Sequence, residues 1–245
     1  MPRTPALFVS LAMPLAACVD GSPPTALANL ETPTVSLHAV NDPTGIYGSQ
    51  VPRSLFEVQV DDVYGDCVRI ADDVTATLDG IGLTSTGRGG GDEHDASGDC
   101  RAATFSLLDP TSTSSSRLVI ADSTATWTID ATNVLANDFE LTVTPGSGAR
   151  VTWHSAPPNR RLDRADAQLA DSDGALLWSS VNDSATVPRA VVATGGNGFD
   201  IDAPGSTTGT VVLAVSATRK NPIDGCDGPE ACTVEARAGR FFTLP

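Results

Sequence analysis

The sequence has little positive charge and few of the motifs on which common enzymes depend. It has 15 Lys and Arg against 30 Asp and Glu, so the formal net charge is −15. Because binding to nucleic-acid phosphates needs a basic surface, we expect no nucleic-acid partner. The three histidines, His38, His94 and His154, are far apart in the chain, and neither a Gly-x-Ser-x-Gly nor a His-Glu-x-x-His motif occurs. These absences favour a protein that is not an enzyme.

Good helix formers are also scarce, whereas residues typical of turns are frequent. Lys220 is the single lysine, and there are 22 Gly and 17 Pro. The hydrophobic share of 40% is enough for one or two packed domains. Segments such as Leu55–Val60 alternate between apolar and polar residues, and turn signals recur along the chain. This pattern predicts an all-β fold of two β-sandwich domains.

Two hairpins are predicted from turn chemistry. Asp79-Gly80 separates Val74–Leu78 from Ile81–Leu83, and this dipeptide supplies the positive φ angles of a tight turn. Asp171–Gly174 separates two further apolar segments in the same way. The stretch from residue 159 to residue 170 stays ambiguous, because the spacing of its apolar residues also permits a short helix.

The N-terminus carries an export signal. One charged residue, Arg3, precedes the apolar run Ala6–Leu15, which is too short to cross a bilayer. The sequence Leu15-Ala16-Ala17-Cys18 that follows resembles the lipobox of bacterial lipoproteins. The resemblance implies cleavage before Cys18 and attachment of diacylglycerol to its thiol. An ordinary export signal with an ordinary cleavage site is the alternative.

The same resemblance suggests where the protein is sorted and how the chain is divided. In lipoproteins, an Asp directly after the lipid-bearing Cys retains the protein at the inner membrane, and here that residue is Val19. The resemblance therefore implies an outer-membrane lipoprotein in the bacterial cell envelope. We expect a signal peptide over 1–17, a lipidated and Pro-rich flexible tether over 18–33, and β-sandwich domains over 34–137 and 138–245.

The number of cysteines agrees with lipidation of Cys18. Five cysteines are present, so using one for lipid leaves an even set in an oxidising compartment. Of the three possible pairings, we prefer the sequential one, Cys67–Cys100 with Cys226–Cys232. A zinc site is the alternative, but no pair has Cys-x₂-Cys spacing.

The second predicted domain is similar to bacterial immunoglobulin-like modules. Phe199–Gly205 leads through an Ala-Pro turn into the Val-rich segment Thr210–Ala217. By this resemblance, Trp153 would be the core tryptophan of an early strand. The resemblance implies an architecture only, because this fold supports many functions.

Acidic loops are the candidate cation sites. Carboxylates at close spacing in a Gly-rich loop suit Ca²⁺, and the strongest candidates are Asp92, Glu93, Asp95 and Asp99. A solvated acidic loop is the simpler interpretation, because EF-hand spacing is absent. The same two interpretations apply to a second set, Asp61, Asp62, Asp66, Asp72 and Asp73. Asp171 and Asp173 are explained more simply as parts of a hairpin turn.

Two other groups of residues have a functional and a structural interpretation. Trp127, Trp153 and Trp178 can form a carbohydrate platform, although burial in the core is favoured in a chain with 5% aromatic residues. Arg160, Arg161 and Arg164 can bind an anionic partner, but two aspartates are interleaved with them, which favours a mixed-charge surface.

The sequence thus predicts a lipid-anchored envelope protein that acts as a non-catalytic binding or structural module. The lipid anchor binds it to the membrane, and another envelope protein or a surface glycan is the expected partner. One alternative is a Ca²⁺-assisted carbohydrate-binding or adhesion module, with Ca²⁺ as its only cofactor. The other alternative is a hydrolase whose catalytic site is assembled in space around one of the histidines.

Overall fold

The computed structural model shows an all-β protein, as the sequence predicts. It describes residues 24–46, 54–62, 69–88, 102–110, 116–131, 133–144, 148–156, 161–181, 187–189, 191–202, 210–223 and 225–244. In these ranges the one helical element is the 3₁₀ turn η1 (Leu27–Asn29). No helix in the described part of the chain is long and apolar enough to cross a membrane.

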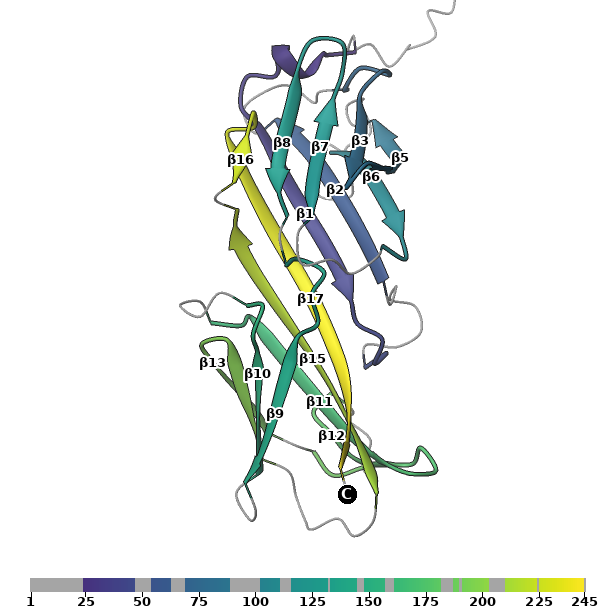
Figure 1. Cartoon of the computed structure of the whole chain (residues 1–245), viewed down its shortest axis with the longest axis vertical. Coiled ribbons are helices and arrows are strands. Elements are labelled where there is room, and N and C mark those ends of the chain that lie inside the picture. Colours follow the sequence, from purple (N-terminus) through teal and green to yellow (C-terminus); the bar gives the residue numbers. More distant parts are fainter. Residues whose placement is uncertain are drawn as a thin grey trace, which may run out of the picture.

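One eight-stranded sheet, here called the long sheet, runs through the whole molecule (Figure 1). Its strands in spatial order are β12 (Leu176–Ser179), β11 (Arg164–Asp171), β15 (Val211–Pro222), β17 (Ala231–Leu244), β1 (Pro33–Asn41), β2 (Ser54–Asp62), β6 (Ala103–Leu108) and β5 (Thr84–Arg88). All neighbouring strands are antiparallel except β1 and β17, which are parallel. The C-terminal strand therefore lies at the centre of the sheet, beside the first strand of the chain.

Two small sheets complete the fold. The upper small sheet has the order β16 (Cys226–Asp227), β8 (Thr126–Asp130), β7 (Arg117–Ala121), β3 (Thr75–Leu78) and β4 (Ile81–Gly82). The lower small sheet has the order β13 (Val191–Gly195), β14 (Gly198–Asp202), β10 (Gly148–Trp153) and β9 (Phe139–Thr144). Figure 1 shows each of them packed against one half of the long sheet.

Side chains on β17 place both small sheets on the same face of the long sheet. Every second residue from Cys232 to Ala238 is buried, and Cys232 is bonded to Cys226 of the upper small sheet. The same alternation continues to Arg240, whose Nη1 donates a hydrogen bond of 2.8 Å to the carbonyl of Phe139 in the lower small sheet. His38, Glu57 and Glu235 alternate with buried neighbours and so belong to the opposite face.

The two halves share one hydrophobic core. Nearly all buried apolar residues belong to a single cluster that extends from Leu27 to the lower small sheet, where it includes Phe199. The 14 residues of β17 span about 46 Å at roughly 3.3 Å per residue and pass through both halves. The body is therefore elongated and continuous, with η1 at one end and the C-terminal end of β17 at the other (Figure 1).

The predicted hairpin at Asp79-Gly80 is confirmed. Leu78 pairs with Ile81, and the two turn residues have φ angles of 52° and 81°. Positive φ at both central positions is the requirement of a type I′ turn. The hairpin at Asp171–Gly174 is also confirmed, because β11 and β12 pair with Leu169 opposite Trp178.

The helical alternative for residues 159–170 is wrong. Residues 164–171 form β11, which pairs with β15 over eight residues. Ala165, Ala167 and Leu169 are buried on one face of this strand, so a period of two replaces the helical spacing. Pairing with a long neighbouring strand outweighs the local helical pattern, because strand preference depends on tertiary context.

The last strands of the chain join the first half of the molecule. Cys226 of β16 pairs with Ile129, and Val35 of β1 pairs with Cys232. Residues 226–238 therefore complete both sheets of the upper half, although they lie well beyond residue 138 in the chain. The division into domains at residue 138 and the immunoglobulin-like resemblance stay predictions.

Candidate functional site

The predicted disulfide between Cys226 and Cys232 is confirmed. Their Cα atoms are 5.9 Å apart, and the bond joins β16 of the upper small sheet to β17 of the long sheet. Closing so short a loop contributes about 2 kcal/mol in the chain-entropy model. The other predicted site residues, Cys18, Cys67, Cys100, Asp92, Glu93, Asp95 and Asp99, lie outside the described residues.

The carbohydrate platform of three tryptophans is wrong, because the core-packing interpretation applies to all three. Trp127 and Trp178 are 4% exposed, and Trp153 is completely buried. The Trp153 ring stacks on Phe139 with 5.2 Å between centroids, and its Nε1 donates to the carbonyl of Ala136 at 3.1 Å. No face of Trp153 is left for a sugar.

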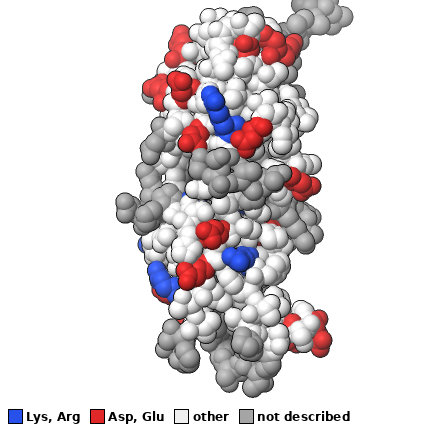
Figure 2. Space-filling model, viewed as in Figure 1, with Lys and Arg blue, Asp and Glu red and all other residues white. Residues whose placement is uncertain are grey.

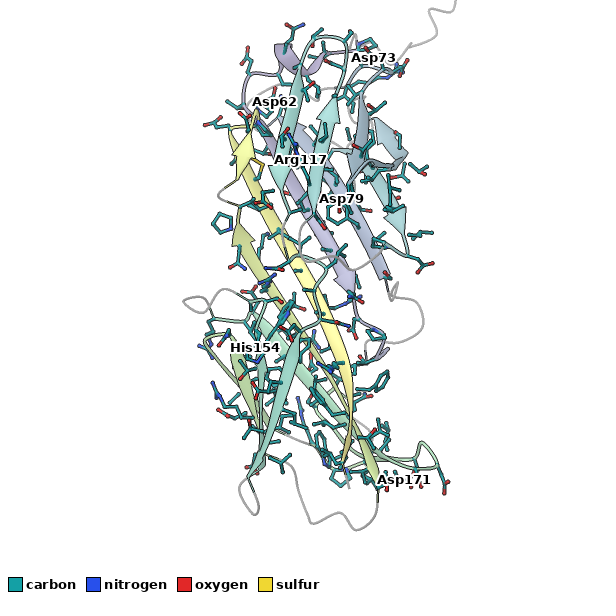
Figure 3. All side chains as sticks on the ribbon, viewed as in Figure 1. Asp62, Asp73, Asp79, Arg117, His154 and Asp171 are labelled. Atoms are coloured by element: carbon teal, nitrogen blue, oxygen red, sulfur yellow. A yellow bond between two sulfur atoms is a disulfide. The ribbon has the colours of Figure 1, made fainter. Side chains whose placement is uncertain are left out.

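The described aspartates of the candidate cation sites accept hydrogen bonds that stabilise turns and contacts between chain segments. Asp62 accepts hydrogen bonds of 3.0 Å from the backbone N–H groups of Glu31 and Thr32. Asp171 accepts from the N–H groups of Asp173 and Ala175 within its own turn. Figure 3 shows both residues at separate places in the molecule. In the described ranges, no group of three His, Cys, Asp or Glu side chains is arranged to hold a metal ion.

The described arginines of the predicted cluster have partners within the protein. Nε of Arg164 lies 2.5 Å from the carboxylate of Asp166, and Nε of Arg161 donates to the hydroxyl of Thr194 at 3.0 Å. Arg160 lies outside the described residues. These contacts agree with the mixed-charge interpretation of this surface.

A buried arginine that the sequence analysis missed lies where the two halves meet. Arg219 of β15 is 5% exposed and donates hydrogen bonds to the carbonyls of Ser155 at 2.6 Å and Asn133 at 3.1 Å. Its guanidinium also lies 4.5 Å from the centroid of the Trp153 ring. Desolvation by burial lowers the pKa of Arg219 to about 10, so the side chain is charged at neutral pH.

A hollow lies on the outer face of the upper small sheet. It has a volume of about 520 Å³ and is lined by Asp79, Ser116, Arg117, Thr128, Asp130, Gly225 and Asp227. Figure 2 shows basic and acidic atoms side by side on this surface, and Figure 3 places Arg117 above Asp79. The polar groups are engaged with one another, because Asp79 accepts from the N–H of Arg117 at 2.7 Å and Arg117 donates to Thr128 at 3.3 Å.

The two described histidines are in different environments. His154 is exposed at the end of the lower small sheet, with its Nε2 at 2.7 Å from a carboxylate oxygen of Glu140 (Figure 3). His38 lies on β1, in the middle of the long sheet, on the face opposite the small sheets. His94 lies outside the described residues. His38 lines a hollow on this face of the long sheet.

That hollow is the candidate functional site and is called the His38 groove from here on. It has a volume of about 240 Å³ and is lined by His38, Ala39, Val40, Leu55, Glu57, Thr218, Glu235 and Arg237. Strand register brings the charged residues together, because His38 lies opposite Glu57 on one side and Glu235 on the other. Side chains directly opposite on one face of a sheet are about 5 Å apart at Cβ.

Several polar groups of the groove are available to a ligand. Glu57 accepts a hydrogen bond of 3.0 Å from Nε2 of Gln59, which orients its carboxylate. The side chains of His38 and Glu235 have no hydrogen-bond or ion-pair partner within the described structure. Arg237 lies with its Nε at 3.7 Å from Oδ2 of Asp42. The groove therefore combines unengaged acceptors with a cation that already has a counter-charge.

Asp42 directly follows β1, lies beside Arg237 of the groove and is itself buried, at 3% exposed. Its Oδ1 accepts from the N–H of Thr44 at 3.1 Å, a local turn typical of Asp, and its Oδ2 accepts from the hydroxyl of Ser216 at 2.6 Å. Gly239 leaves the space that this carboxylate occupies, since a Cβ there would lie 2.1 Å from Oδ1. These contacts connect the end of β1 to Ser216 of β15 and to Gly239 of β17.

Comparisons with known proteins identify no relative of this chain. No family model, no curated protein and no solved structure matches the chain.

Proposed function

We propose that this protein is a lipid-anchored cell-envelope protein whose body is a non-catalytic binding module. Lipidation at Cys18 is supported by the resemblance of Leu15–Cys18 to a lipobox and by the even number of cysteines that remain. The described chain enters the fold near η1, at one end of the elongated body (Figure 1). An anchor before residue 24 would direct the other end of the body away from the membrane.

The observation that carries the binding role is the His38 groove. Its polar side chains come from neighbouring strands of a continuous sheet, and sites on rigid elements hold their geometry well. Unengaged acceptors on such a surface suit recognition of a partner that supplies donors. We place the protein at the outer membrane by its resemblance to sorted lipoproteins, with another envelope protein or a surface glycan as the class of partner.

Hydrolysis is a second candidate, because the His38 groove is the kind of concave polar site that this alternative requires. A hydrolase needs a nucleophile within hydrogen-bond reach of its base, at about 2.6–3.2 Å. His38 has no such bond in the described structure, although Thr218 lines the same groove. Hydrolysis of generic nitrophenyl esters that is lost in both His38→Ala and Thr218→Val would favour the hydrolase over the binding module.

Protease treatment of intact cells tests where the body is displayed. The full-length protein is followed by blotting, with and without permeabilisation of the outer membrane. We expect Cys18→Ala to release the protein from the membrane fraction, because it removes the thiol that would carry the lipid. If Cys18→Ala is anchored as well as the natural protein, the lipoprotein proposal is wrong. Digestion on intact cells would identify surface display, and protection until permeabilisation would place the body in the periplasm and favour a partner within the envelope.

A further inference from the structure

The His38 groove contains more negative charge than its own cation neutralises. Glu57 and Glu235 each contribute a carboxylate, whereas the charge of Arg237 is matched by Asp42 at 3.7 Å. Lys220 lies opposite Glu235 on β15 but forms no ion pair with it in the described structure. The three carboxylates of Glu57, Glu235 and Asp42 thus outnumber the two cations Arg237 and Lys220 by one charge, and charge complementarity favours a cation.

The available hydrogen-bonding groups point to the kind of cation. A carboxylate only accepts hydrogen bonds, and an ammonium group offers three donors. Glu57 and Glu235 present carboxylate acceptors from the two strands that flank His38. A bare metal ion does not match, because the described residues hold no group of three ligands arranged for one. An ammonium group supplies donors for these acceptors.

The size and the walls of the groove set the rest of the ligand. The groove has a volume of about 240 Å³. This is below the usual range for drug-sized ligands, so the groove fits a short chain. Val40 and Leu55 supply apolar lining beside the carboxylates. Methylene groups pack well against such a surface while a charged end reaches polar groups.

We propose that the His38 groove binds a primary alkylammonium group, with Glu57 and Glu235 taking the charge and Val40 and Leu55 covering the methylenes. The inference deepens the proposed binding function and depends on it. The group can come from a free amine or from a lysine side chain of a partner protein. The two sources share the chemistry and differ in what surrounds the ammonium.

Calorimetric titration of the full-length protein in detergent tests the proposal. The probes are n-butylammonium and a capped pentapeptide with one lysine between glycines, and n-butanol is the uncharged control. We expect saturable binding of at least one amine probe, on the order of 1 mM for so few atoms, and none of n-butanol. Glu235→Gln and Glu57→Gln should each weaken binding at least tenfold. Glu140→Gln, on the lower small sheet, is the matched control and should bind as the natural protein does.

The outcomes distinguish the sources and can overturn the proposal. Tighter binding of the peptide identifies a partner lysine, and tighter binding of butylammonium identifies a free amine. No saturable binding of either amine, or equal binding by the natural protein and the two groove variants, refutes the inference. Thermal unfolding of each variant verifies that it is folded. Membrane anchoring is measured separately, so a protein that is anchored but binds no amine refutes only this inference.

Discussion

The hydroxyl of Ser216 donates a hydrogen bond of 2.6 Å to the carboxylate of Asp42, although the two residues are 174 positions apart in the chain. Asp42 follows the first strand, and Ser216 belongs to the long strand β15 of the second half. The bond is buried, and Arg237 adds its charge at 3.7 Å. The two halves are thus joined on one face of the long sheet by Asp42 and on the other face by Arg219.

Replacing Asp42 should destabilise the whole protein. Asp42→Ala removes the acceptor of Ser216 and of Thr44 and leaves Arg237 without its carboxylate. Breaking one partner of a buried charged network costs about 3–5 kcal/mol, and urea unfolding measures it. Ser216→Ala removes one hydrogen bond to this carboxylate and should cost about 1.5–3 kcal/mol. Equal stability of Asp42→Ala and the natural protein would show that this contact does not join the halves.

Gly239 should not tolerate a methyl group. A Cβ at this position would lie 2.1 Å from Oδ1 of Asp42 and 3.0 Å from the carbonyl oxygen of Val215. We expect Gly239→Ala to cost about 1–3 kcal/mol, as overpacking of a buried site does. Gly195→Ala is the control, because nothing lies within 4 Å of its added Cβ. Thermal melting of the two variants compares them, and similar melting temperatures would contradict the described packing.

Arg219 should stabilise the contact between the two halves of the molecule. Arg219→Met keeps an apolar chain of similar length but leaves the carbonyls of Ser155 and Asn133 without their donor. Each lost hydrogen bond to a charged group costs about 1.5–3 kcal/mol, offset in part because the buried charge is also removed. The guanidinium lies over Trp153, so we also expect the tryptophan emission to change. Unchanged emission together with unchanged stability would contradict the contact.

Asp122 should make the attachment of the N-terminal turn dependent on pH. Desolvation raises the pKa of Asp122, but hydrogen bonds from Leu27, Thr124 and Ala125 outweigh it and lower the pKa below 3.8. The folded-state pKa is thus below the unfolded one, so the stabilisation is present above pH 3.8 and is lost as the pH falls through the folded-state value.

Amide exchange at Leu27 measures this effect. The N–H of Leu27 donates to Oδ2 of Asp122 at 2.7 Å, so its protection should decrease as the pH falls below about 3.8. Asp122→Asn cannot ionise and should show no such step in protection. A step of the same size in the variant would assign the pH dependence to another group.

Local chemistry made parts of the fold predictable. The hairpin at Asp79-Gly80 was predictable because this dipeptide favours the positive φ angles of both turn residues. The disulfide was predictable because its two cysteines are separated by 6 positions in the chain. In contrast, the parallel pairing of β1 with β17 joins distant residues such as Ser36 and Thr233, whose hydroxyls are 3.2 Å apart across 197 positions. No local pattern encodes such a register.

The same distinction explains what the sequence revealed of the site. His38 was recognisable as a candidate, but Glu235 joins it only through the pairing of β1 with β17. Arg219 precedes Lys220 near the end of a strand, a position typical of exposed charge, and its burial depends on Trp153 and on two distant carbonyls. Tertiary packing decides the environment of both residues.

The mass of the N-terminal peptide of the protein purified from membranes tests the central claim most directly. If the protein is a lipid-anchored envelope module, this peptide begins at Cys18 and carries the added mass of a diacylglycerol on its thiol. A peptide that begins at another residue, or an unmodified Cys18 in protein that is nonetheless membrane-bound, would contradict the claim.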